Sequence, residues 1–218
     1  MTSYSYLVTD LIQATENNGT EFLAYTPKMI NKAEERLTRD LDDYGLQATT
    51  SVAVSSNTAA VTLPTGTRII KNFNVISDSS RINLLLRTDE YLNDYWPVSA
   101  SVGTPTYYAR TGDATVKVAP TPTSTLNGEI VHISRPTTLS SVSETNYFTN
   151  RCYDVLFNAS MVEALIFMKN WSIVPMYESR YKEGVASLRN QARRTRRDDM
   201  QAPRSPQGAD NNITKGEN

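Results

Sequence analysis

The fold is decided first by residues 22–41, which read FLAYTPKMINKAEERLTRDL. Apolar side chains recur there at steps of three or four residues, at Met29, Ile30, Ala33, Leu37 and Leu41. This spacing predicts an amphipathic helix with one apolar stripe and a charged opposite face. Thr26 and Pro27 predict its start, because threonine caps helices and proline is tolerated in the first turn. Gly45 predicts its end.

Helical patterns continue at both ends of the chain. A short amphipathic piece covers Tyr6 to Gln13 and is ended by the Asn-Asn-Gly sequence at 17–19. After Pro136, either Ser143 or Thr149 is expected to cap a helix that carries apolar residues from Cys152 to Met168. Because this helix is apolar on more than one side, we expect it to be central.

One more helix is expected after an interruption at residues 173–175, Ile-Val-Pro. Its apolar stripe consists of Tyr177, Tyr181, Val185, Leu188 and Ala192. It is predicted to end in the basic run 193–197, RRTRR.

Between these helical regions the chain is rich in Thr, Ser, Val and Ile. Turn residues separate seven predicted strands: Ser51–Val54, Ala59–Leu63, Arg68–Ile76, Arg81–Leu86, Thr106–Arg110, Ala114–Ala119 and Glu129–Ser134. Many short strands with frequent turns favour a sandwich or platform. One helical turn is expected over Thr88–Tyr95, before Trp96-Pro97. Asn127-Gly128 is assigned to the loop before the last strand.

The order of helices, strands and helices predicts an α+β fold. Residues 1–48 and 136–197 are expected to form one helical bundle from both chain ends, with residues 49–135 as an inserted β-rich domain. Chain ends often lie close together, which makes such an insertion feasible. Residues 198–218 are polar and have few apolar side chains, so they are predicted to form an extended, flexible arm.

Composition argues against an enzyme and against a general nucleic-acid coat. The 218-residue chain has a formal net charge of −1, one cysteine and one histidine. An internal disulfide, a histidine-based zinc site and a histidine-centred triad are therefore disfavoured. We expect His132 to be a packed or edge histidine and Cys152 a small buried apolar residue. No catalytic, cofactor-binding or metal-binding residues are predicted, and no apolar run approaches the ~20 residues of a membrane helix.

The strongest local feature is a group of arginines near the end of the last helix. It consists of Arg189, Arg193, Arg194, Arg196 and Arg197. Guanidinium groups suit carboxylates and phosphates, so the group could dock onto an acidic partner protein or contact DNA phosphates. A third interpretation is a solvated helix end whose cations complement the helix dipole. Partner docking is favoured, because no aromatic residues alternate with the arginines as in many nucleic-acid sites. Three residues of the arm are assigned to the same partner surface: Met200, Pro203 and Arg204.

Aromatic and acidic residues supply two further candidate surfaces. Tyr91, Tyr95 and Trp96 fit either a partner contact or local packing, and we assign them as candidate contacts to a tail partner. Trp171 is expected in the core. A cluster formed by Asp40, Asp42 and Asp43 is assigned as candidate channel lining. A solvated face is the alternative interpretation, and nothing in the sequence fixes the separation that an acid/base pair would need.

Several segments, taken together, resemble the head-to-tail adaptor (connector) proteins of short-tailed bacteriophages. The run from Phe22 to Leu37, followed by Arg39-Asp40-Leu41, resembles their opening helix. The later matching pieces are Pro105–Arg110, Pro136–Leu139, Asn146-Tyr147-Phe148 and the helix from Tyr153 to Lys169. Their order and spacing are more specific than any single piece, and together they cover most of residues 20–190.

The resemblance implies a structural virion protein, not an enzyme. Such adaptors form homo-oligomeric rings, usually of twelve subunits, docked to the portal protein at the capsid–tail junction. The ring extends the channel through which genomic DNA passes without sequence-specific binding, and it seats the tail nozzle or fibres. A protein of this kind is made in the host cytoplasm, has no membrane partner and needs no cofactor. The alternative function is a nucleic-acid-binding module that uses the arginine-rich helix.

Overall fold

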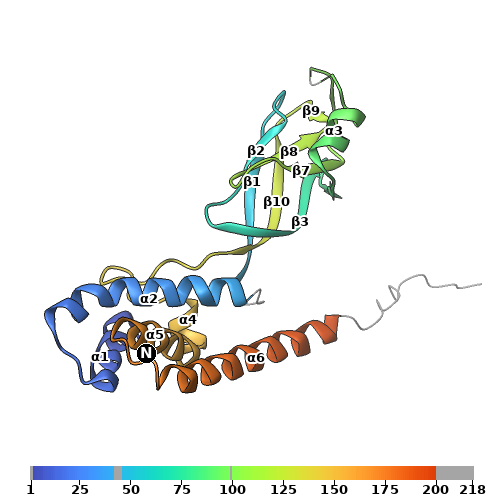
Figure 1. Cartoon of the computed structure of the whole chain (residues 1–218). Helices are drawn as coiled ribbons and strands as arrows, with labels where there is room; N and C mark the ends of the chain where they lie inside the picture. Colours follow the sequence, from blue (N-terminus) through green and yellow to red (C-terminus); the bar gives the residue numbers. More distant parts are fainter. Residues whose placement is uncertain (1, 42–45, 99, 200–218) are drawn as a thin grey trace, which may run out of the picture.

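The computed structural model describes residues 2–41, 46–98 and 100–199, and the side chains of residues 193–199 lie outside this description. The predicted α+β class is confirmed, because helices and antiparallel sheets both form (Figure 1). The helices are α1 (Tyr4–Thr15), α2 (Thr20–Asp40), α3 (Asp89–Tyr95), α4 (Tyr147–Arg151), α5 (Tyr153–Phe167) and α6 (Val174–Asp199). The strands are β1 (Gln47–Val54), β2 (Ala60–Thr62), β3 (Thr67–Ser77), β4 (Ser80–Asn83), β5 (Leu85–Leu86), β6 (Val102–Gly103), β7 (Tyr107–Arg110), β8 (Thr115–Ala119), β9 (Thr121–Pro122) and β10 (Leu126–Ser134).

Helix α2 begins six residues before the predicted start at Thr26 and Pro27, so that prediction was wrong. Pro27 lies inside the helix, and the Thr26 hydroxyl donates to the Phe22 carbonyl at 2.8 Å instead of capping. The first turns are held by packing, because Phe22 is buried against α5 and its ring meets Phe167 edge-on at 6.1 Å. Tertiary burial therefore outweighs the cost of an interior proline. Gly45, the predicted end, lies outside the described residues.

Neither residue predicted to cap the helix after Pro136 does so. Asn146 is the N-cap of α4, and its side chain accepts hydrogen bonds from the backbone N–H groups of Phe148 and Thr149. Thr149 completes a capping box by accepting from the Asn146 N–H. A break at Cys152 then separates α4 from α5.

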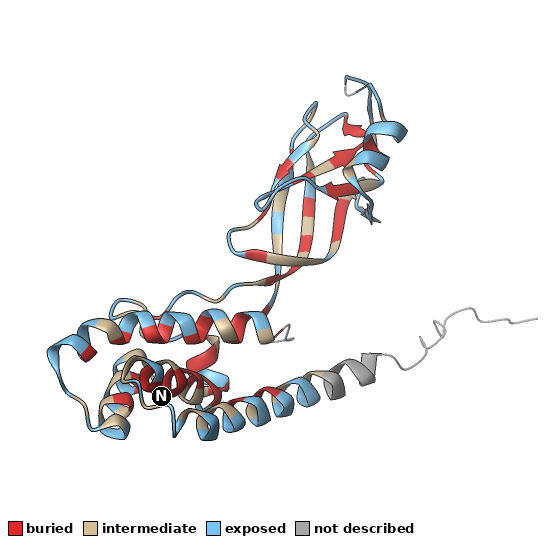
Figure 2. Cartoon of the chain, in the orientation of Figure 1, coloured by how far each residue is buried: buried red, intermediate tan, exposed pale blue. Residues whose placement is uncertain are grey.

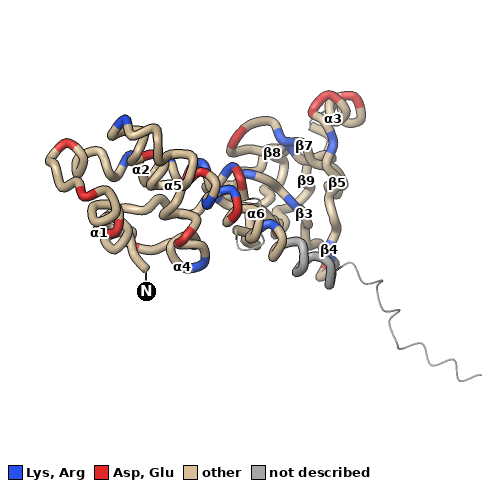
Figure 3. The backbone as a smooth tube through the Cα atoms, turned by 60° about the horizontal axis from the view of Figure 1, so that its bottom comes forward, with Lys and Arg blue, Asp and Glu red and all other residues tan. Residues whose placement is uncertain are grey.

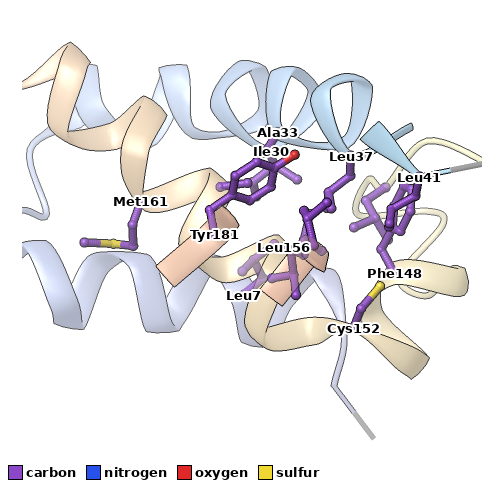
Figure 4. Packing of buried hydrophobic residues seen from close by; sticks show 14 of the residues in the cluster. Leu7, Ile30, Ala33, Leu37, Leu41, Phe148, Cys152, Leu156, Met161 and Tyr181 are labelled. Carbon is purple, nitrogen blue, oxygen red and sulfur yellow. The ribbon is translucent and has the colours of Figure 1, made fainter. Parts of the chain in front are cut away.

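Helix α5 is central, as predicted, and packs against α1, α2, α4 and α6. These five helices, called the helical lobe below, share one hydrophobic cluster drawn from both ends of the chain (Figure 4). Leu7 and Leu37 come from the N-terminal helices, while Phe148, Leu156 and Tyr181 come from the C-terminal ones. Figure 2 shows this buried interior where α5 lies against its neighbours.

The last helix begins at Val174, so Pro175 falls in its first turn, where a missing N–H costs little. Tyr181 and Val185 of the predicted stripe are buried, and the remaining stripe residues are half-buried. Gly184 permits the close approach of α6 to α5, because a Cβ there would lie 2.6 Å from a methyl group of Val155.

The strands and α3 form a second unit, called the β lobe below. Its two four-stranded sheets have the orders β1-β10-β3-β4 and β2-β8-β7-β5, and β6 pairs with β9. Both large sheets contribute to one cluster of buried side chains, including Phe73 from the first and Val116 from the second. The predicted strand regions are confirmed, except that Arg81–Leu86 is two strands, β4 and β5, in different sheets.

Asn127-Gly128 lies within β10 and not in the predicted loop. Gly128 pairs with Val52 of β1 on one side and Val75 of β3 on the other. A Cβ at this position would lie 2.9 Å from a Val52 methyl carbon and 3.0 Å from the Phe73 ring. Glycine is therefore used here for close packing between strands and not for a turn.

Candidate functional site

The arginine-rich end of the chain belongs to α6. Its backbone is helical to Asp199, two residues into the segment predicted as the arm. Figure 1 shows the last described turns of α6 extending past the other helices of the helical lobe. The side chains of Arg193, Arg194, Arg196 and Arg197 lie outside the described part of the chain, as do Met200, Pro203 and Arg204.

Arg189 is the one predicted partner-binding arginine whose side chain is described. Its guanidinium donates from Nε and from one terminal nitrogen to the Asp40 carbonyl, at 3.0 and 2.6 Å. Arg189 thus stabilises the C-terminal end of α2, where carbonyl groups lack helical partners. Arg189 anchors α6 within the helical lobe, and two of its guanidinium nitrogens already donate to α2 there.

Asp40, predicted as channel lining, lies in the same place. Its carboxylate accepts a hydrogen bond from the buried Tyr181 hydroxyl at 2.5 Å. Burial, and next the hydrogen bond to Asp40, raise the pKa of Tyr181, so the phenol stays a donor. The structure therefore brings together residues that were assigned to two separate sites. Asp42 and Asp43 lie outside the described residues.

The α2–α6 contact continues in an ion-pair network. The Arg36 guanidinium lies 4.2 Å from the centre of the Tyr181 ring and 2.6 Å from the Glu178 carboxylate. Lys182 reaches the same carboxylate at 3.3 Å. The hydrogen bond from Arg36 lowers the pKa of Glu178. These contacts fix how the basic end of α6 leaves the helical lobe.

The predicted tail-contact residues lie at the end of the β lobe that is far from the helical lobe (Figure 1). The Tyr91 and Tyr95 rings are stacked with centres 5.9 Å apart, and both meet Tyr107 edge-on. The Arg87 guanidinium lies 5.6 Å from the Tyr91 ring centre, a cation–π distance. Tyr91 and Tyr95 are exposed, whereas Trp96 is half-buried and donates from Nε1 to the Ser101 carbonyl at 2.9 Å.

More apolar side chains are exposed beside these tyrosines. They are Leu85, Leu86, Val98 and Val102, with exposed fractions from 42% to 58%. We call this group, with Tyr91 and Tyr95, the α3 patch. Leu86 and Tyr91 line one depression, and adjoining exposed apolar side chains are typical of protein–protein contacts. The sequence interpretation missed the four aliphatic residues, because it assigned Leu85 and Leu86 to an ordinary strand, and β5 is an edge strand.

Two findings from known proteins now bear on the chain. The model of the SU10 adaptor protein family matches residues 3–207. The chain belongs to this family. No curated protein matches it. The match confirms the resemblance to phage adaptors, and the protein is a structural component of a bacteriophage virion.

As a virion adaptor, the protein interacts with other components of the particle. Within the described residues, no helix combines the length and the apolar character needed to cross a membrane. Figure 3 shows that Lys and Arg, and Asp and Glu, are spread over both lobes, with acidic residues on α3. Charged and exposed apolar surfaces are therefore the candidate functional features of the described residues.

The described residues of the adaptor contain no group of three or more His, Cys, Asp and Glu side chains able to hold a metal ion. His132 is buried, as expected for a packed histidine, and its ring nitrogens lie 3.2 and 3.1 Å from the hydroxyls of Thr50 and Thr67. Burial lowers its pKa. Cys152 is buried in the main cluster, which confirms that prediction.

Glu34 is a buried acidic residue that the sequence interpretation did not single out. The residue is only 5% exposed, and its carboxylate accepts hydrogen bonds from the Leu139 N–H at 3.0 Å and from the Asn146 amide at 2.5 Å. Burial raises the pKa of Glu34, and the two hydrogen bonds oppose that change. Glu34 fastens α2 to the segment that returns from the β lobe. Glu34 directly follows Ala33 of the apolar stripe of α2, and this position was the sign in the sequence that it could be buried.

The prediction that Trp171 lies in the core was wrong. Its side chain is 62% exposed, in the turn between α5 and α6. Ile173 and Met176, close by in sequence, are also exposed. A tight turn at the end of the lobe leaves a large side chain no interior to enter, so Trp171 is a further candidate contact residue of the adaptor.

Proposed function

We propose that this adaptor forms a homo-oligomeric ring, with twelve subunits, at the capsid–tail junction. The ring docks to the portal protein through the end of α6 and the arm, and it seats the tail nozzle or fibres through the α3 patch. It extends the channel through which genomic DNA passes, without sequence-specific contacts. In this proposal residues 1–48 and 136–197 act as one bundle, residues 49–135 as an inserted domain and residues 198–218 as the arm.

The observation that carries the proposal is the separation of two exposed surfaces. The α3 patch lies at the far end of the β lobe, while the end of α6 leaves the helical lobe elsewhere (Figure 1). A protein that joins two different partners needs two surfaces that can be covered at once. Arginines suit an acidic partner, and exposed aromatic and aliphatic side chains suit an apolar one.

The α6 end is suited to docking because its base is held firmly. Arg189, Tyr181 and Arg36 bind it to α2, so the following turns leave the lobe in one direction. Arginines that follow this anchor are presented with little loss of backbone entropy on binding. Many such weak contacts around a ring combine into a stable joint.

Deletion of residues 198–218 tests the portal contact. We expect the shortened chain to keep its unfolding curve, because the described cores lie before residue 198. We expect it to lose binding to a candidate portal, measured by electron microscopy or native mass spectrometry of the mixture. A matched control is Glu21→Lys, an exposed change on α2. Undiminished portal binding by the shortened chain would remove the arm from the proposal.

A salt titration separates this proposal from nucleic-acid binding. An adaptor with the proposed function has little affinity for DNA at physiological salt. A DNA-binding module would bind at low salt and lose affinity steeply as salt rises, in proportion to its phosphate contacts.

A further inference from the structure

Three arginines surround a depression on the β lobe. It is lined by Arg68 at the start of β3, Arg110 at the end of β7 and Arg135 just after β10, together with Gly66, Thr67 and Asp113. Asp113 contributes the only carboxylate among these lining residues, so positive charge is in excess. Such a group of guanidinium ions is suited to binding carboxylates.

The Arg110 side chain is held in place by hydrogen bonds to backbone carbonyls and by an ion pair with the Asp113 carboxylate at 3.3 Å. Arg110 donates to the carbonyls of Arg68 at 2.6 Å, Gly112 at 3.1 Å and Asp113 at 2.9 Å, which fixes the turn after β7 against the start of β3. The Arg135 backbone N–H donates to the Gly66 carbonyl at 2.8 Å. The side chain of Arg135 is exposed and also borders a second depression that contains Glu34.

A complementary acidic surface lies on α3. Leu92 faces the core, Asp89 and Asn93 face Lys117, and Tyr91 and Tyr95 face Tyr107. The helical repeat places Glu90 and Asp94, one turn apart, on the remaining outward face. Both are exposed, and among the described residues neither forms an ion pair or a hydrogen bond. We call this pair the acidic ridge.

Glu90 and Asp94 are not among the residues that line the depression of their own chain. A second copy of the chain can present the ridge instead. The α3 patch borders the ridge, and Leu86 and Tyr91 of the patch line a further depression with Arg110. Apolar area and opposite charges are therefore available side by side on the β lobe, which is what a protein interface needs.

We propose that the acidic ridge of one subunit, formed by Glu90 and Asp94, docks into the arginine depression of the next subunit, formed by Arg68, Arg110 and Arg135. This contact joins two different surfaces, so when each subunit uses them on two different neighbours, its repetition generates a closed ring or an open filament. The inference rests on the ring of the proposed function and names the contact that builds it.

Charge reversal on each side tests the contact. Glu90→Lys with Asp94→Lys reverses the ridge, and Arg68→Glu with Arg135→Glu reverses the depression. Arg110 is left unchanged because its side chain holds the turn. We expect each double variant to weaken subunit association at least about tenfold, measured by sedimentation and native mass spectrometry at low salt. A chain that carries all four changes restores opposite charges and should assemble again, as should an equal mixture of the two double variants.

Two control variants change net charge equally at other places. Glu16→Lys with Glu21→Lys matches the ridge variant, and Lys28→Glu with Arg151→Glu matches the depression variant; all four residues are exposed in the helical lobe. Both controls should assemble like the wild type. Arg135→Glu alone keeps the test valid if the Arg68 change impairs folding, which thermal unfolding would reveal.

The outcomes distinguish failure of this proposed contact from failure of the proposed ring. If the wild type assembles and the reversed variants assemble equally well, the contact is wrong and the ring stands. If the four-fold variant stays dissociated, the two surfaces do not meet, and the contact is again wrong. A wild-type chain that stays monomeric up to its solubility limit overturns the ring and this contact together. If the depression variant loses only binding to a DNA duplex, the depression serves a polyanion and not a second copy.

Discussion

Replacement of Gly184 by alanine is expected to loosen α6 from α5. A Cβ at Gly184 would lie 2.6 Å from one Val155 methyl carbon and 3.6 Å from the Val155 Cβ. Val155 is 1% exposed, and a β-branched side chain has one strongly preferred rotamer in a helix. Rotation of the valine cannot relieve the clash without strain, so the two helices must move apart.

The size of the effect follows from two opposing terms. Overpacking of a filled core costs about 1–3 kcal/mol, whereas alanine gains about 1 kcal/mol over glycine in helix propensity. We expect Gly184→Ala to destabilise the fold by about 1 kcal/mol. Val155→Ala alone removes two buried carbons and leaves a cavity, at a cost of about 2 kcal/mol. In the double variant the clash disappears, and the expected cost is about 1 kcal/mol, below the roughly 3 kcal/mol of additive behaviour.

Urea denaturation followed by circular dichroism measures all three variants. Ser187→Ala, on the exposed face of the same helix, is the matched control and should change stability by only a few tenths of a kcal/mol. The reasoning is refuted if the two single effects add within about 0.5 kcal/mol, since independent sites behave in that way. It is also refuted if Gly184→Ala stabilises the chain by the full propensity gain.

Three further substitutions test other contacts within the structure. Tyr181→Phe should destabilise the fold by about 1.5–3 kcal/mol, because the phenol donates to the Asp40 carboxylate, and denaturant titration measures the loss. Gly128→Ala should lower the thermal midpoint by an amount equivalent to about 1–3 kcal/mol, because its Cβ would lie 3.0 Å from the Phe73 ring. Burial raises the pKa of Glu34, so just above pH 4.5 the folded chain binds more protons than the unfolded chain, and the Glu34 contribution to stability falls as pH rises. Glu34→Gln should abolish that part of the slope in a series of denaturation curves, and an unchanged slope would show that Glu34 does not cause it.

The strands were predictable because their signals are local. Segments rich in Thr, Val and Ile, and the turns between them, located β3 and β8 within one residue of their observed bounds. The division of 81–86 into β4 and β5 was not predictable. It depends on the backbone N–H of Leu84 bonding to the Phe73 carbonyl and that of Leu85 bonding to the Thr106 carbonyl, in the other sheet. The residues of one apolar run contain no signal that the chain passes from one sheet to the other within it.

The candidate surfaces were predictable by residue type and not by surroundings. The tyrosines of α3 were identified as possible contacts from their chemistry, but their exposure depends on how α3 packs on Tyr107. Trp171 was expected in the core and is exposed, whereas Glu34 lies on a helix whose charged face was expected to be solvated, and it is buried. Both results depend on partners distant in sequence, or on their absence, and periodicity within one helix carries no such information.

The charge pattern limits how copies of this adaptor can meet. A net charge of −1, from 22 basic and 23 acidic residues, gives little long-range repulsion between subunits. The relative orientation of two subunits must then come from the electrostatic fields of local charge groups, and these fields decay within about 10 Å at ordinary salt. The described residues offer two such fields of opposite sign on one lobe, the acidic ridge and the arginine depression. A contact between two different surfaces, repeated from one subunit to the next, is the kind that can close a ring.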